Sequence, residues 1–146
     1  MNSAPELKAW SRSVDERITA IRHELESASG GRARLLPVTK AFGPEAVQVV
    51  REAGLTEVGE SYAQELVAKH QEVDDSEISW HMIGRLQRNK VRPLAELVSL
   101  WQSVDRPELV DEIARWAPEA RVLIQVNVLD HPEQGGCRPG EVEGLV

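Results

Sequence analysis

The first thirty residues carry an amphipathic pattern that is typical of one long helix. Apolar side chains recur every three or four positions and gather into one stripe, which consists of Leu7, Trp10, Val14, Ile18, Ile21, Leu25 and Ala28. Ser3 and Glu6 have the spacing of a capping box at the start of this helix, and Gly30-Gly31 ends it. The pattern therefore predicts a single helix that ends before Gly30.

From residue 32 onward, short apolar runs alternate with amphipathic stretches. We expect strands over residues 32–40, 56–59, 78–83, 98–104 and 121–128, and helices that begin at Pro44, at Ser61, near Leu86 and at Asp105. The alternation repeats at intervals of about twenty residues, which is the pattern of βαβ units in a parallel sheet.

Two architectures share this alternation, an open doubly wound sheet and a closed (β/α)8 barrel. No G-x-G-x-x-G follows the first strand, so a dinucleotide site is not supported. A barrel takes roughly 200 residues or more, whereas residues 141–146 already resemble the start of another helix. We expect an α/β fold of the (β/α)8 TIM-barrel type, as one domain over residues 1–146 with about five βα units present and the C-terminal part of the barrel missing. A short open sheet is the alternative.

Composition narrows the classes of partner. A formal net charge of −7 disfavours nucleic acid or an anionic membrane surface as the main partner. No apolar run approaches the ~18 residues of a membrane span. The single cysteine, Cys137, can form no internal disulfide and fits a cytoplasmic protein. The four histidines lack the spacing of metal ligands, so we expect no metal site.

Lys40 is the residue with the most chemical interest. It closes the first apolar run, where partial desolvation would favour the neutral amine. A neutral amine attacks an aldehyde to form a Schiff base. From the local sequence alone, a lysine that extends from the strand end into water is the commoner arrangement.

Further polar residues stand at or near the ends of neighbouring strands. Glu60 could hold charge or a proton near Lys40, or face solvent in a turn. His81 could lie over a ligand ring or pass a proton, and Asn127 could donate to a ligand oxygen. Each of these residues could instead have a purely structural role. Ser61, likewise, could simply cap the helix that follows it.

Five short strings resemble the pyridoxal phosphate homeostasis protein family in order and spacing. They are LPVTK at 36–40, VGESYAQE at 58–65, WHMIGRLQRNK at 80–90, SVD at 103–105 and LIQVN at 123–127. The third string is highly specific, and the resemblance covers about residues 33–136.

This resemblance implies a barrel related to the N-terminal domain of alanine racemase, with pyridoxal 5'-phosphate (PLP) held as a Schiff base on Lys40. Ser61, His81 and Asn127 would be further cofactor-binding residues. The implied protein is cytoplasmic, serves vitamin B6 homeostasis without turnover and therefore has no catalytic residues. It would buffer the cofactor and deliver it to PLP-dependent apo-enzymes.

The chain also departs from the family pattern. Ser61 stands where the family usually has asparagine, and residues 133–136 replace a loop that usually carries a lysine. The family's phosphate cradle lies on later strands, so we expect weakened phosphate anchoring. Two enzymes are the alternatives. A PLP-dependent amino-acid racemase or decarboxylase usually needs a second domain, and a Schiff-base aldolase leaves the other strings unexplained.

Overall fold

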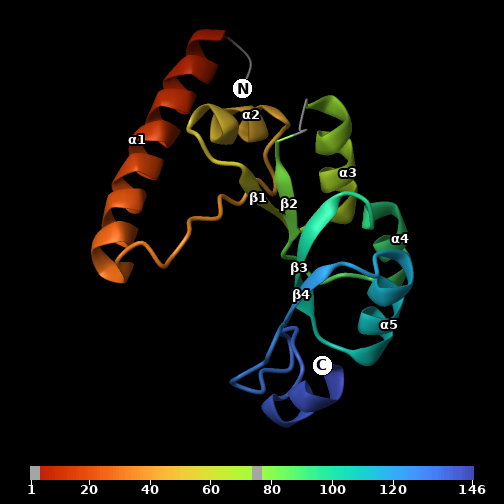
Figure 1. Ribbon diagram of the computed structural model, residues 1–146. Helices are drawn as coiled ribbons and strands as arrows, with labels where there is room; N and C mark the ends of the chain where they lie inside the picture. The colour runs from red at the N-terminus through yellow and green to blue at the C-terminus, as the bar shows by residue number, and fades with distance from the viewer. Residues whose placement is uncertain (1–3, 74–76) are drawn as a thin grey trace.

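The computed structural model describes residues 4–73 and 77–146. In chain order the elements are α1 Ala4–Ser29, α2 Glu45–Glu52, β1 Glu57–Glu60, α3 Ala63–Glu72, β2 Ser79–Met82, the 3-10 helix η1 Arg88–Lys90, α4 Val91–Leu94, β3 Val98–Val104, α5 Pro107–Trp116, β4 Arg121–Ile124 and the 3-10 helix η2 Pro139–Leu145 (Figure 1). The expected capping box falls on Ser3, which lies outside the described residues.

The four strands form one parallel sheet in the order β1-β2-β3-β4, so each strand pairs with its predecessor in the chain. Helices α3, α4 and α5 all cover the same face of this sheet (Figure 1). A doubly wound sheet has helices on both faces. Sequential strands with helices on one face are instead the arrangement of a (β/α)8 barrel segment, so the expected α/β barrel fold is confirmed as a partial barrel.

The hydrophobic core lies between the sheet and the helices that cover it. Its most buried members are Val47, Val58, Leu66, Trp80, Met82, Val91, Leu94, Trp101, Val104, Leu109 and Ile113. Trp80 and Met82 face this core, and because side chains alternate along a strand, His81 between them faces the opposite side. We call that opposite side the inner face of the sheet. It corresponds to the interior of the barrel.

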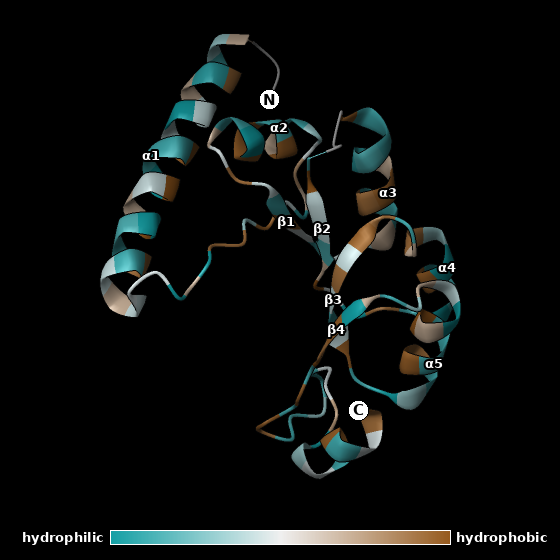
Figure 2. Cartoon of the chain, viewed as in Figure 1, coloured by the Kyte–Doolittle hydropathy of each residue, from teal (hydrophilic) through white to brown (hydrophobic). Residues whose placement is uncertain are grey.

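Helix α1 stands to one side of the sheet and is largely hydrophilic, in contrast to the apolar stretch in β3 (Figure 2). Ile18 is the one member of its apolar stripe that is buried among the described residues. Trp10 stacks on Phe42 at 5.9 Å between ring centroids, and Arg22 donates to the carbonyl oxygens of Ala53 and Gly54, both at 3.2 Å. The stripe thus predicted the helix correctly, but most of it does not enter the core.

The expected strand over residues 32–40 is extended without being a regular strand. It pairs with β1 through one bridge, from Val38 to Gly59. The N–H of Thr39 donates to Gly59 O at 3.0 Å, and the N–H of Gly59 donates to Pro37 O at 2.8 Å. Pro37 has no N–H to donate, so the ladder cannot continue past it. The bridge still places the end of this segment beside β1.

Other elements are shorter than expected. The helix near Leu86–Leu97 is only η1 and the single turn α4, because Pro93 removes a backbone donor and crowds the preceding turn. The fifth strand ends at Ile124 and resumes only as a bridge between Val126 and Cys137. The helix expected from residue 141 is part of η2.

Within residues 4–73 and 77–146, none of the helices has the length and apolar character needed to cross a membrane. The same residues contain no group of three or more His, Cys, Asp or Glu side chains arranged for a metal ion.

Candidate functional site

Lys40 lies in a tight turn directly after the extended segment. The N–H of Phe42 donates to Thr39 O at 3.1 Å, which closes a turn over residues 39–42. Ala41, the third residue of this turn, has a φ of 64°, the left-handed conformation that a type II turn requires there. Glycine usually occupies such a position, because a Cβ makes it unfavourable. The turn therefore needs support from its surroundings.

The Lys40 side chain itself is exposed. Its ammonium forms no hydrogen bond or ion pair with any residue that the structure describes. The expected partial desolvation of this amine is therefore wrong for the chain as described. The reason is the turn, which carries Lys40 beyond the pairing with β1 instead of leaving it within a buried strand.

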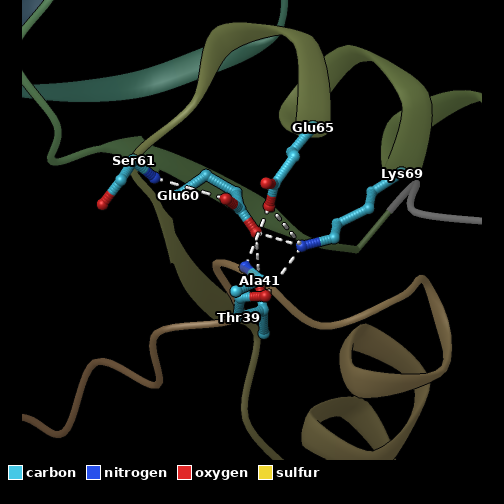
Figure 3. A network of polar contacts seen from close by, with 6 residues as sticks. All are labelled: Thr39, Ala41, Glu60, Ser61, Glu65 and Lys69. Atoms are coloured by element: carbon cyan, nitrogen blue, oxygen red, sulfur yellow. Dashed lines mark hydrogen bonds and ion pairs between the residues drawn. The ribbon is translucent and has the colours of Figure 1, made fainter.

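A buried polar network lies beneath the turn (Figure 3). Thr39 and Lys69 are each 3% exposed and Glu60, the last residue of β1, is fully buried. The ammonium of Lys69 donates to Thr39 O at 2.7 Å and forms an ion pair with Glu60 Oε1. The Thr39 hydroxyl donates to the same Glu60 oxygen at 2.8 Å. Three elements are thus joined around one buried ion pair.

The network extends to the residues on either side of this ion pair. Glu65 Oε2 lies 3.6 Å from Lys69 Nζ and accepts the N–H of Ala41 at 2.9 Å. Glu60 Oε2 accepts the N–H of Ser61 at 3.2 Å. We call this set of residues the Lys69 network: Thr39, Ala41, Glu60, Ser61, Glu65 and Lys69. It holds the backbone both before and after Lys40.

Lys69 was missed by sequence reasoning, and Glu60 was assigned to the wrong environment. Glu60 neither faces solvent nor approaches the Lys40 ammonium, because its carboxylate is buried against Lys69. Two features of the sequence could have indicated Lys69. It stands four residues after Glu65, the spacing of a helical ion pair, and three residues after Leu66, which places it on the buried face of α3.

Ser61 does not cap helix α3. The helix begins at Ala63 with Tyr62 as its N-cap, and no side chain makes a capping hydrogen bond there. The predicted cap is therefore wrong. The side chain of Ser61 is directed away from Lys69 (Figure 3), and Ser61 lines an open cleft of about 320 Å³ together with Arg85 and other residues.

His81 is buried on the inner face of β2. The Gln102 side-chain amide donates to His81 Nδ1 at 2.9 Å, so the ring proton lies on Nε2, 3.7 Å from Glu57 Oε1. Desolvation by burial lowers the pKa of His81 from its ordinary 6.5. Arg34 and Arg121 also lower this pKa, whereas Glu57 acts in the opposite direction. The ring is therefore held neutral and in a fixed orientation.

The strand register relates His81 to Lys40. Val38, Gly59 and His81 lie level with one another across three neighbouring segments of chain. Lys40 follows Val38 by two residues and lies in the turn, past the bridge that joins this segment to β1. The register therefore places His81 level with the residue two positions before Lys40.

Asn127 holds the loop that follows β4. Its side-chain nitrogen donates to His131 O at 2.8 Å and to Gln134 O at 3.3 Å. Its side-chain oxygen accepts the N–H of His131 at 3.1 Å. The amide is thus engaged with loop backbone, and the cofactor contact of Asn127 stays a prediction.

The chain is similar in sequence to known proteins. No protein-family model matches the chain. The chain is 36% identical over 140 residues to the pyridoxal phosphate homeostasis protein of Aquifex aeolicus, covering 89% of this chain and 61% of that protein. It is 32% identical over 142 residues to the protein of that name from Pseudomonas aeruginosa, covering 90% and 62%.

Solved structures are similar as well. PipY of Synechococcus elongatus, solved without PLP, superposes with a TM-score of 0.78 at 30% identity, covering 90% of this chain and 63% of PipY. PipY with PLP bound gives a TM-score of 0.77 at 29% identity, with the same coverage. Alanine racemase of Clostridium difficile has a TM-score of 0.65 at 12% identity, over 84% of this chain and 35% of the racemase. That last likeness shows the fold alone.

The sequential parallel strands, the helices on one face and the structural matches define a partial barrel of the alanine racemase type. Within that class, the chain belongs to the pyridoxal phosphate homeostasis protein family, as its five strings predicted. It spans about 60% of the length of the curated relatives that it matches, which is 62% and 61% for the two named above.

Proposed function

We propose that this chain binds PLP and holds it as a Schiff base on Lys40, as part of a protein of vitamin B6 homeostasis. The observation that carries the proposal is the contrast between two lysines. Lys40 offers an exposed amine without a partner among the described residues, on a turn held at both sides. Lys69 is buried and paired. PipY, a similar protein, has been solved with PLP bound.

The residues present fit the aldehyde end of the cofactor. The Lys40 nitrogen would form a C=N bond with the aldehyde carbon, and the aldehyde oxygen would leave as water. No ion pair has to be broken first, because the Lys40 ammonium has no partner in the described part of the chain. We propose His81, Ser61 and Asn127 as the surrounding residues. His81 would present its neutral ring from the inner face, and Asn127 would act from the end of the loop that it holds.

A carrier without turnover suits this site better than an enzyme does. The two acids of the Lys69 network, Glu60 and Glu65, are both engaged by Lys69 and by backbone N–H groups. Neither is free to exchange protons with a substrate beside Lys40. The likeness to alanine racemase and to lysine decarboxylase of Selenomonas ruminantium is below 25% identity and concerns the fold alone. We propose PLP-dependent apo-enzymes of the cytoplasm as the recipients of the cofactor.

Absorption spectroscopy tests this proposal directly. PLP is added to the purified chain, and we expect a visible Schiff-base band that survives dialysis. Lys40→Ala should abolish the band, whereas Lys8→Ala, at an exposed position on α1, should leave it unchanged. Borohydride reduction followed by peptide mapping should place the cofactor on Lys40. Cofactor found on another lysine, or on none, would overturn the site, and substantial racemisation of alanine would overturn the carrier.

A further inference from the structure

We infer that Lys69 is a positioning residue for Lys40: its buried ammonium fixes the turn over residues 39–42 and thereby presets the direction from which the Lys40 amine meets an aldehyde. This inference rests on the proposed function, because it concerns the same amine. It assigns to Lys69 no contact with the cofactor, since the Lys69 side chain is only 4% exposed.

The burial of Lys69 needs an explanation. Lysine is almost never fully buried unless it is paired. A buried ion pair contributes little to stability compared with apolar residues of similar volume, because both charges have to leave water. The Lys69–Glu60 pair is therefore poorly explained as a stabilising contact. A geometric role is the better explanation, and the atoms that Lys69 reaches show what that role is.

Lys69 acts on the turn at its first residue. The carbonyl oxygen of Thr39 accepts both the N–H of Phe42, which closes the turn, and the ammonium of Lys69 at 2.7 Å. The Thr39 side chain is held in addition by Glu60. Thr39 can therefore neither rotate nor shift without breaking contacts to a buried charge.

The network acts on the turn again at its third residue. Glu65 Oε2, 3.6 Å from Lys69 Nζ, accepts the N–H of Ala41. Ala41 has a φ of 64°, a conformation that a residue with a Cβ keeps only when its surroundings hold it there. Lys69 thus fixes the backbone on both sides of Lys40, while the Lys40 side chain remains free.

A turn that is held in place reduces the entropy that is lost when the Lys40 amine and an aldehyde are brought into bonding geometry. The effect on ligand affinity should therefore be selective. Loss of the Lys69 network should weaken the binding of PLP, which carries the aldehyde. It should not weaken the binding of pyridoxine 5'-phosphate, which has an alcohol at that carbon and forms no Schiff base.

The test uses the full chain with the double variant Lys69→Met/Glu60→Gln. Both charges are removed together, so no unpaired charge is left buried, and the glutamine keeps an oxygen for the Thr39 hydroxyl. The matched control is Lys8→Met/Glu16→Gln, which removes the same two charges at exposed positions on α1. Circular dichroism confirms the fold of each variant before affinities for PLP and for pyridoxine 5'-phosphate are measured.

We expect PLP affinity to fall about five- to thirty-fold in the double variant, while affinity for pyridoxine 5'-phosphate and both affinities of the control stay within about twofold. Unchanged PLP affinity, or an equal loss for both ligands, would overturn the inference. The two proposals fail in different ways. If Lys40→Ala leaves the Schiff-base band intact, the proposed function is wrong. If Lys40→Ala removes the band but the double variant binds PLP like the wild type, only the positioning role is wrong.

A second variant keeps the test decisive if the double variant does not fold. Glu65→Ala removes the acceptor for the Ala41 N–H at a position where the side chain is 37% exposed, so the core is little disturbed. We expect the same selective loss of PLP affinity, and equal binding by Glu65→Ala and wild type would contradict the inference.

Discussion

The carbonyl oxygen of Ser61 and the α-carbon of Gly84 pack so closely that a Cβ at residue 84 would lie 2.0 Å from that oxygen. The contact joins the end of β1 to the end of β2, where the N–H of Ile83 also donates to Glu60 O at 2.8 Å. Glycine is required here for space. The close approach holds the end of β1, which carries Glu60 and Ser61, against the end of β2.

Replacing Gly84 by alanine should therefore be costly. The oxygen that the new methyl group meets belongs to backbone, which can move only by separating the two strands. We expect Gly84→Ala to lower the free energy of unfolding by about 1–3 kcal/mol or more, measured by urea denaturation. Gly144→Ala is the control because no atom lies within 4 Å of its added Cβ. Equal free energies of unfolding for the two variants would contradict this, because they would mean that β1 and β2 can move apart at no cost.

The Lys69–Glu60 ion pair gives a second prediction. Lys69→Met alone leaves the Glu60 carboxylate buried without its counter-charge and should destabilise the fold by about 3–5 kcal/mol. Adding Glu60→Gln should restore most of that loss, because both charges are then gone. A double-mutant cycle in chemical denaturation measures the coupling. Simple addition of the two single effects would argue against a buried pair.

His81 makes stability depend on pH. Its pKa is lowered in the folded chain by desolvation, so the unfolded chain takes up a proton near pH 6.5 while the folded chain does not. The unfolded state then binds more protons, and the free energy of unfolding should fall as the pH is lowered below about 6.5. Urea denaturation above and below that pH measures the slope, and His81→Gln should reduce it. An unchanged slope in the variant would assign the dependence to other groups.

Asn127 should matter for the loop after β4 more than for the sheet. Asn127→Ala removes three side-chain hydrogen bonds to loop backbone and should cost about 1–3 kcal/mol. Limited proteolysis should show faster cleavage within residues 128–136. In the control, Gln134→Ala, the carbonyl that accepts from Asn127 is retained, so cleavage should stay slow. Slow cleavage in both variants would contradict this role for Asn127.

The elements that are determined by their own local sequence were predicted more accurately than the others. The strand over residues 98–104, with the sequence VSLWQSV, was predicted with the bounds of β3, and the polar Asp105 marks its end. The segments that contain Pro37 and Pro93 were overestimated, since the apolar pattern ignores a missing N–H. In both cases the pattern indicated the element and backbone chemistry set its length.

The same distinction applies to the site. Lys40 could be placed at a strand end from its own neighbours in the sequence. The role of Lys69 could not be predicted, because it depends on how α3 packs against the end of β1 and on the turn that follows Thr39. Contacts between residues thirty positions apart, such as Lys69 and Thr39, are fixed only by tertiary structure.

The order of the strands has a consequence for how the chain folds. Each of β2, β3 and β4 pairs with the strand that immediately precedes it in the chain. Bringing each pair together closes only the one crossover between them, so the loop-closure entropy of each step is small. The sheet can therefore grow by one strand at a time in the order of synthesis, with each completed unit serving as the template for the next.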